Sequence, residues 1–169
     1  MLLHVAKRVN RPTARVVLLD EDDRVLLVRV LDRVTGGPAV WLTPGGGVEE
    51  GEDLATAAMR ELQEETGLTI GLADIGRPVA VSRGDWEFRG QPMYSEDWYF
   101  VHRTSAFKPD EAGWTELEKE IHAGWRWWTL DELDHAPETV IPAGLAGLVR
   151  GLGADPPPPG PIELEWTDA

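Results

Sequence analysis

The first half of the chain alternates short apolar runs with polar turns. Arg15–Leu19 and Arg24–Leu31 are mainly apolar segments on either side of the acidic turn Asp20–Asp23. Runs of this length, bounded by turn residues, are typical of buried strands. Val40–Leu42 predicts a further strand, and we interpret residues 1–13 as a leader or an edge strand.

A helical pattern follows at Leu54–Glu65. Apolar residues recur there every four positions, which places them on one helix face. They are Leu54, Ala58 and Leu62, with Ala55 beside them. Asp53 is suited to cap the first turn, and Gly67 is suited to end the helix in a left-handed conformation. The opposite face, which we expect to be exposed, carries Glu61, Glu64 and Glu65.

The second half of the chain predicts a long hairpin. Pro78–Arg89 and Met93–Phe107 are aromatic-rich strands joined by a bend at Gly90–Pro92, and Lys108–Gly124 is a polar, acidic connection. A strand and two helices are then expected, in that order, at Trp125–Thr129, Leu130–Leu133 and Pro142–Leu152.

Strands that flank an early helix and precede a late one predict an α/β fold, a mixed sheet with helices on both faces. A length of 169 residues suits one domain, which we place at residues 1–153. Residues 154–169 form a proline-rich tail, in which Pro156–Pro161 is a stiff extended linker. The last residues, Ile162–Ala169, are compatible either with disorder or with an added strand.

The three glutamates on one helix face need a counter-charge. Carboxylates a few ångströms apart repel one another, and this raises the pKa of at least one of them. Divalent cations relieve the repulsion and also bridge to phosphate oxygens. The alternative is that the glutamates are the solvated face of an amphipathic helix.

Composition narrows the partners. The formal net charge is −14, which argues against a DNA or RNA duplex because such a partner needs a basic surface. Small phosphorylated substrates are compatible with this charge, since bound metals reverse the local field. Cysteine is absent and no apolar run near the N-terminus is long enough for a signal peptide or a membrane span. We therefore expect a cytoplasmic protein that does not bind membranes, and a homodimer is left open.

The glycine loop and the helix together follow a strict spacing. Gly46 is followed after five residues by Glu52, after seven more by Arg60–Leu62, and then by Glu64–Glu65 and Gly67–Leu68. This pattern resembles the Nudix box, the signature of the Nudix hydrolase family, at every defining position. The resemblance implies an α/β/α sandwich with a mixed β-sheet.

The resemblance also implies a reaction, the hydrolysis of a nucleoside diphosphate linked to another group X by in-line attack of a metal-activated water. It implies that Arg60 orients the glutamates and that Glu52 steadies the loop. The implied metal ligands are Glu61, Glu64 and Glu65. The implied loop that lets substrate and metal approach is Gly45, Gly46 and Gly47. Mg²⁺ fits such an all-oxygen site, with Mn²⁺ as a substitute.

The general base has several candidates. The resemblance allows either the box residue Glu61 or a glutamate in a loop near the last strand, and the loop here offers Glu116, Glu118 and Glu120. We favour Glu120 because it lies closest to the strand at Trp125–Thr129. The alternative is that the three loop glutamates only solvate an acidic segment.

Aromatic and arginine side chains offer further contacts to a nucleotide. Most of the aromatic residues are expected to pack in the sheet, namely Trp98, Tyr99, Phe100, Trp125, Trp127 and Trp128. Three lie nearer predicted loop ends, where a ring could stack on a nucleobase, namely Trp41, Trp86 and Tyr94. Arg83 and Arg89 could pair with substrate phosphate, or with neighbouring acidic residues at the surface.

The substrate itself is not identified by any marker. Nudix subfamilies that cleave ADP-ribose or diadenosine polyphosphates carry a proline or a tyrosine at a set distance after the box, but Pro78 lies too early and Tyr94 too late. A nucleoside triphosphate or a nucleotide sugar stays open. A catalytically silent nucleotide-binding sensor on the same fold is the alternative function, although every box carboxylate is present.

Overall fold

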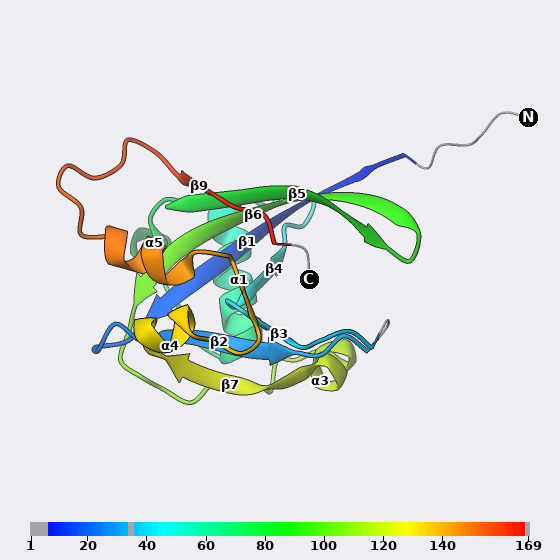
Figure 1. Cartoon of the computed structure of the whole chain (residues 1–169), viewed down its shortest axis with the longest axis horizontal. Helices are drawn as coiled ribbons and strands as arrows, with labels where there is room; N and C mark the ends of the chain where they lie inside the picture. Colours follow the sequence, from blue (N-terminus) through cyan, green and yellow to red (C-terminus); the bar gives the residue numbers. More distant parts are fainter. Residues whose placement is uncertain (1–6, 34–35, 168–169) are drawn as a thin grey trace, which may run out of the picture.

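The computed structural model describes residues 7–33 and 36–167, which form a mixed β-sheet with helices on both faces (Figure 1). The strands are β1 (Val9–Leu19), β2 (Val25–Val30), β3 (Val40–Leu42), β4 (Gly45–Gly47), β5 (Ala80–Phe88), β6 (Gln91–Arg103), β7 (His122–Trp128), β8 (Thr139–Ile141) and β9 (Ile162–Leu164). The helices are α1 (Leu54–Thr66), α2 (Leu72–Ile75), α3 (Glu116–Ile121), α4 (Leu130–Asp134) and α5 (Leu145–Gly151).

Strand β1 organises the sheet. Within the described residues the strand order is β8-β3-β2-β1-β6-β5-β9, with β7 paired to β2 and β4 paired to β1. Along its whole length β1 pairs in parallel with β6, whereas it meets β2 only where Leu19 faces Val25. At Thr13–Arg15 the neighbour of β1 is instead the glycine strand β4. The sheet therefore splits beside β1, and the glycine loop lies at that split.

Side chains of β1 alternate between two cores. Val17 and Leu19 pack on the face covered by α4 and α5. Val16 and Leu18 pack on the other face, against α1 and the nearby α2. Figure 1 shows α4 and α5 in front of the sheet and α1 behind it. This double burial explains the nearly continuous apolar run in the sequence, and it confirms the predicted sandwich.

The box helix and the hairpin are confirmed. Asp53 caps α1 by accepting the backbone N–H of Thr56, and Gly67 ends the helix with φ 78°. The strands β5 and β6 pair antiparallel from Ala80 and Tyr99 to the bend before Gln91. The predicted strand at Trp125–Thr129 is the last part of β7 except for Thr129, which caps α4, and the predicted helix at Pro142–Leu152 is the shorter α5.

Four short elements were not predicted from the sequence, one of which is β4, because Gly45–Gly47 were expected to form a loop. The stretch Lys108–Gly124 is not only a polar connection, because it contains α3, which begins with a capping box in which Thr115 and Glu118 bind each other's backbone N–H groups. The four-residue helix α2 has no apolar periodicity to reveal it. The three-residue strand β8 is defined by its parallel pairing with β3, a contact between distant parts of the chain.

The C-terminal tail docks on the sheet. Strand β9 pairs in parallel with β5, with Ile162 opposite Ala80 and Leu164 opposite Ser82. Of the two expectations for Ile162–Ala169, the added strand is therefore the observed one at Ile162–Leu164, and residues 165–167 continue without regular secondary structure. Of the predicted leader or edge strand, residues 1–6 lie outside the described residues, and Val9 onward belongs to β1. Among the described residues, no helix is long and apolar enough to cross a membrane.

Candidate metal centre

Three carboxylates converge beside the glycine loop. Glu61 and Glu65 come from α1, and Glu118 comes from α3. Each glutamate offers one carboxylate oxygen, and these three oxygens all lie within 4.8 Å of one another. Oxygen atoms at such separations are suited to share a hard divalent cation, so the donor set fits Mg²⁺ or Mn²⁺.

Glu65 is the buried member of this group. Its residue is only 5% exposed, and its Oε2 accepts the backbone N–H of Gly45 at 2.8 Å. Burial raises the pKa of Glu65 to about 8, although the hydrogen bond from Gly45 and the charge of Arg15 act in the opposite direction. The expectation that the whole acidic face is exposed is wrong at this position, because α1 turns Glu65 toward the split beside β1.

Glu61 lies directly against the glycine loop. Its side chain is 13% exposed and accepts a hydrogen bond from Nη1 of Arg60 at 2.8 Å. Burial raises its pKa above the ordinary value of 4.5, while Arg60 opposes that shift. A Cβ atom on Gly46 would lie 2.6 Å from Cδ of Glu61. Glycine at this position therefore allows the loop and the carboxylate to approach each other.

Arg60 joins the loop to the acidic face. Its Nε and Nη2 donate to the two carboxylate oxygens of Glu52 at 2.9 and 3.0 Å, and Nη2 also donates to the Gly47 carbonyl at 2.9 Å. These hydrogen bonds lower the pKa of Glu52. Glu52 in turn accepts the backbone N–H of Glu49. This geometry is compatible with the expected orienting role of Arg60 and the expected steadying role of Glu52, which stay predictions.

Glu64 lies outside the three-carboxylate group. Its side chain is 43% exposed, and Oε2 is 3.2 Å from Nη1 of Arg60. The predicted set of Glu61, Glu64 and Glu65 is therefore only partly brought together, and Glu118 occupies the third place.

Glu120, the base favoured from the sequence, is exposed and is not part of the group. Positions two apart on a helix point about 200° apart, so Glu118 and Glu120 face different directions from α3. The Thr115–Glu118 capping box fixes the start of this helix. Proximity in sequence to the following strand was thus a poor guide. The capping-box spacing from Thr115 to Glu118 is the signal that could have placed Glu118 in the first turn of a helix.

The segment before α3 packs closely on α1. Trp114 is 8% exposed and donates its indole N–H to the Glu65 carbonyl at 2.8 Å. A Cβ atom on Gly113 would lie 2.5 Å from the carbonyl oxygen of Glu64. Neither residue could be identified from the sequence, because their role depends on contacts between segments about 50 residues apart.

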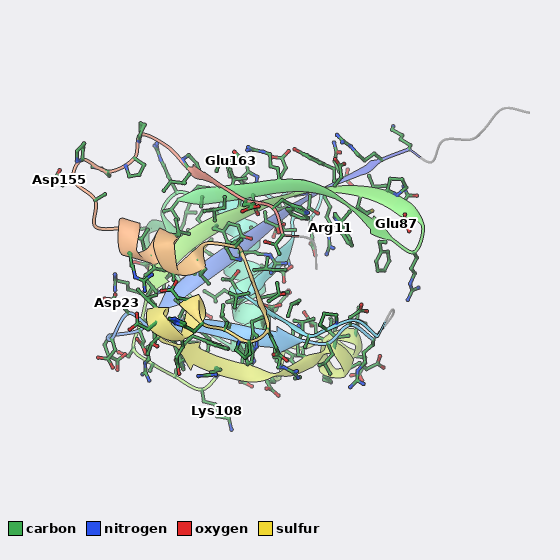
Figure 2. The ribbon with its side chains drawn as sticks, in the orientation of Figure 1. Arg11, Asp23, Glu87, Lys108, Asp155 and Glu163 are labelled. Atoms are coloured by element: carbon green, nitrogen blue, oxygen red, sulfur yellow. The ribbon has the colours of Figure 1, made fainter. Side chains whose placement is uncertain are left out.

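The other predicted contact residues have different positions. Arg83 forms ion pairs with Glu96 and with Glu163 of β9, so it ties the tail to the hairpin in the observed state. Trp41 packs edge-to-face on Trp128, and Arg8 lies over the ring of Tyr94. Figure 2 shows Glu163 on β9, beside the hairpin.

The glycines of the loop lie close to the acidic group of the metal centre. Gly45, Gly46 and Gly47 form β4 beside β1. Gly45 has φ 142° and leaves no room for a Cβ atom, which would lie 2.4 Å from the Ala14 carbonyl oxygen. Because Gly45 has no side chain, its backbone can approach Glu65 closely. A direct role of Gly45 in substrate binding stays a prediction.

Comparison with known proteins decides the family. The family model of the NUDIX domain matches residues 9–146. The chain belongs to the Nudix family. The resemblance of the box is thereby confirmed, and so is the fold that it implied.

Relatives of this Nudix chain cover most of its length. An RNA pyrophosphohydrolase of Caulobacter vibrioides is 37% identical, with 84% of this chain and 89% of that protein covered. Nudix hydrolase 25 of Arabidopsis thaliana is 30% identical, with 73% and 74% covered. The crystal structure of a MutT protein from Methanosarcina mazei has a TM-score of 0.57 at 20% identity, covering 85% of this chain and 93% of that one. The last similarity supports the fold alone.

Proposed function

We propose that this protein is a metal-dependent pyrophosphohydrolase that cleaves a diphosphate bond in a nucleotide-type substrate. The observation that carries the proposal is the convergence of Glu61, Glu65 and Glu118 within 4.8 Å. Membership of the Nudix family and relatives named RNA pyrophosphohydrolase support the same reaction class. The expected location in the cytoplasm and a homodimer stay predictions.

The metal ligands of this proposal are Glu61 and Glu65, with Glu118 opposite them on α3. A bound Mg²⁺ would offset the negative charge of substrate phosphates and acidify a bound water. The exposed Glu64 would be able to join the ligands by leaving its ion pair with Arg60, as the resemblance to the box implies. The buried Glu65 has to be ionised to bind the cation, and its hydrogen bond from Gly45 favours that form.

We assign the role of proton acceptor to Glu118 rather than to Glu120. A general base has to reach the water it deprotonates. Among the candidate glutamates of α3, Glu118 is the one that lies beside the box glutamates. In this proposal Glu61 serves as a metal ligand instead.

Two substrate classes follow. The acidic chain favours a compact nucleotide, a nucleoside triphosphate or a nucleotide sugar, whose phosphates are neutralised at the metal. The names of the relatives favour a second class, the 5′-triphosphate end of an RNA. In that case only the terminal nucleotides would need to enter the site, so no basic surface for a duplex is required.

A substrate panel tests the proposal. Nucleoside triphosphates, nucleotide sugars and a 5′-triphosphate oligoribonucleotide are incubated with Mg²⁺ while release of phosphate, pyrophosphate or nucleotide is followed. Glu64→Gln and Glu65→Gln are assayed beside the wild type. We expect hydrolysis that needs the cation and falls by about 10²-fold or more in both variants. Binding without turnover across the panel would instead favour the silent sensor.

A further inference from the structure

A small pocket opens on the face of the sheet opposite α1. It has a volume of about 190 Å³. Its floor consists of polar residues of β1 and β6, namely Arg11, Thr13, Arg15, Ser95 and Asp97. Its sides are Leu42, Ile141, Trp86 and Trp166 with the adjoining Thr167. Pockets for drug-sized ligands are about 300–1,000 Å³, so this one suits a single flat ring system.

The pocket adjoins the metal centre through two arginines. Arg15 faces Gly45 across β1 and β4, and its charge acts on the buried Glu65. Arg11 lies beside Gly47, since a Cβ there would be 3.8 Å from its Nε. No ion pair of Arg11 is found among the described residues, which leaves its guanidinium available to a phosphate. The two arginines therefore link the pocket to the glycine loop that contacts Glu61 and Glu65.

The floor is a preformed polar surface. Thr13 donates its hydroxyl to Asp97 at 2.6 Å, and the two residues are 3% and 7% exposed. The Nε atom of Arg15 is buried and has no hydrogen-bond partner among the described residues, although it lies 4.0 Å from Oδ2 of Asp97. Trp86 donates its indole N–H to the hydroxyl of Ser95. A buried donor without a partner is uncommon in folded proteins, and it is a group that a polar ligand would satisfy.

One side of the pocket comes from outside the matched NUDIX domain, which spans residues 9–146. Trp166 follows β9, and its ring lies on Gly84, where a Cβ atom would be 2.1 Å from the ring carbon Cγ. Only glycine at position 84 leaves space for the indole. Ion pairs between Arg83 and Glu163 help to hold the same segment. Trp166 and Arg11 line the same pocket.

We propose that this pocket receives the nucleobase of the substrate and that Trp166 is a specificity-determining residue contributed by the C-terminal segment. The inference rests on the proposed function for its substrate class. An indole beside a flat, polar-floored pocket is suited to stack on a base. The phosphates would then run past Arg11 toward Glu61 and Glu65.

Matched variants test the proposal in the full-length protein. Trp166→Ala removes the ring, Trp166→Phe keeps an aromatic ring, and Gly84→Ala displaces the indole without deleting it. Ile162→Ala is the control, because Ile162 lies in the same segment but lines a different pocket. Binding of nucleoside 5′-monophosphates is measured by calorimetry beside ribose 5-phosphate, which has no base, and KM and kcat are measured for the best substrate of the panel.

We expect Trp166→Ala and Gly84→Ala to weaken monophosphate binding and raise KM by about tenfold or more, with kcat little changed. Ribose 5-phosphate binding should stay the same, Trp166→Phe should recover most of the affinity, and Ile162→Ala should behave as the wild type. Equal losses for ribose 5-phosphate, or unchanged monophosphate binding in both Trp166→Ala and Gly84→Ala, would overturn the inference. Base-dependent binding without hydrolysis would contradict the proposed function while leaving this inference intact.

Discussion

At the scale of single residues, the chemistry depends on how Glu65 is held. It is buried and accepts one backbone hydrogen bond, and its pKa is raised to about 8 from an ordinary value of 4.5. The folded protein therefore binds a proton at Glu65 over a range where the unfolded chain has lost it. The contribution of Glu65 to stability is thus lost as pH rises from about 5 to 8.

The raised pKa of Glu65 predicts how the stability of the metal-free protein depends on pH. Between pH 6 and pH 9 in the presence of a chelator, the wild type should lose stability relative to Glu65→Gln by on the order of a few kcal/mol. Thermal or denaturant unfolding of the two proteins measures the difference. Added Mg²⁺ should reduce the wild-type loss, because the cation favours the ionised form. Parallel pH profiles for the two proteins would show that Glu65 is not perturbed by burial.

A second residue-scale prediction concerns the glycine loop. Gly46→Ala places a Cβ against Glu61, whereas Gly47→Ala meets no atom closer than the Arg11 side chain at 3.8 Å. Misplacing a reacting group by about 1 Å costs on the order of 10²-fold in rate. We therefore expect kcat to fall by about that factor in Gly46→Ala and to change little in Gly47→Ala. Steady-state kinetics decide, and equal effects of the two substitutions would contradict this view of the loop.

At the scale of elements, α3 brings the third carboxylate to α1. The helix is only six residues long and has no buried residue, so its position depends on the Thr115 cap and on the contact of Trp114 with Glu65. Short helices are marginal without such support. The sequence predicted α1 and its caps well, because that information lies in one local segment; of the three expected ligands of α1, the structure brings Glu61 and Glu65 together and leaves Glu64 outside the group. It did not predict α3, and it offered Glu118 as a candidate base without selecting it over Glu120, since that choice depends on contacts with a helix that lies far away in the sequence.

The cap of α3 can be tested against that of α4. Thr115→Ala and Thr129→Ala each remove a threonine from the same kind of capping box, and each should cost about 1 kcal/mol of stability. We expect Thr115→Ala alone to lower kcat, by several-fold, because it loosens Glu118. Unfolding measurements and kcat values on both variants check this. A loss of activity in Thr129→Ala equal to that in Thr115→Ala would show a general effect of stability instead.

At the scale of the whole molecule, the negative net charge and the docked tail influence which substrates reach the metal centre. The formal net charge of −14 opposes the approach of long polyanions, whereas ionic strength of about 0.1 M screens charges beyond roughly 10 Å. The sequence indicated this charge directly. The sequence did not decide whether the tail is disordered or forms an added strand. Strand β9 is recognised only by its pairing with β5, and the position of Trp166 only by its contact with Gly84.

A salt dependence follows from the charge. If 5′-triphosphate RNA is a substrate, KM for a long oligonucleotide should decrease, at constant free Mg²⁺, as salt rises from about 50 to 200 mM, because screening weakens repulsion. A protein that binds nucleic acid through a basic surface shows the opposite trend. Initial rates across this range, with a nucleoside triphosphate as the short control, measure it. An increase of KM with salt would reveal a cationic binding surface and contradict this expectation.

The assignment of Glu118 as the proton acceptor is tested most directly by comparing kcat of Glu118→Gln and Glu120→Gln at saturating Mg²⁺ and substrate. The two glutamates lie on the same short helix, and Gln at position 118 can still accept the backbone N–H of Thr115 through its amide oxygen, which preserves the capping box. With Glu118 facing Glu61 and Glu65, we predict a fall of about 10²-fold or more in Glu118→Gln and a nearly unchanged rate in Glu120→Gln. A large fall in Glu120→Gln with Glu118→Gln unaffected would contradict the assignment of the site.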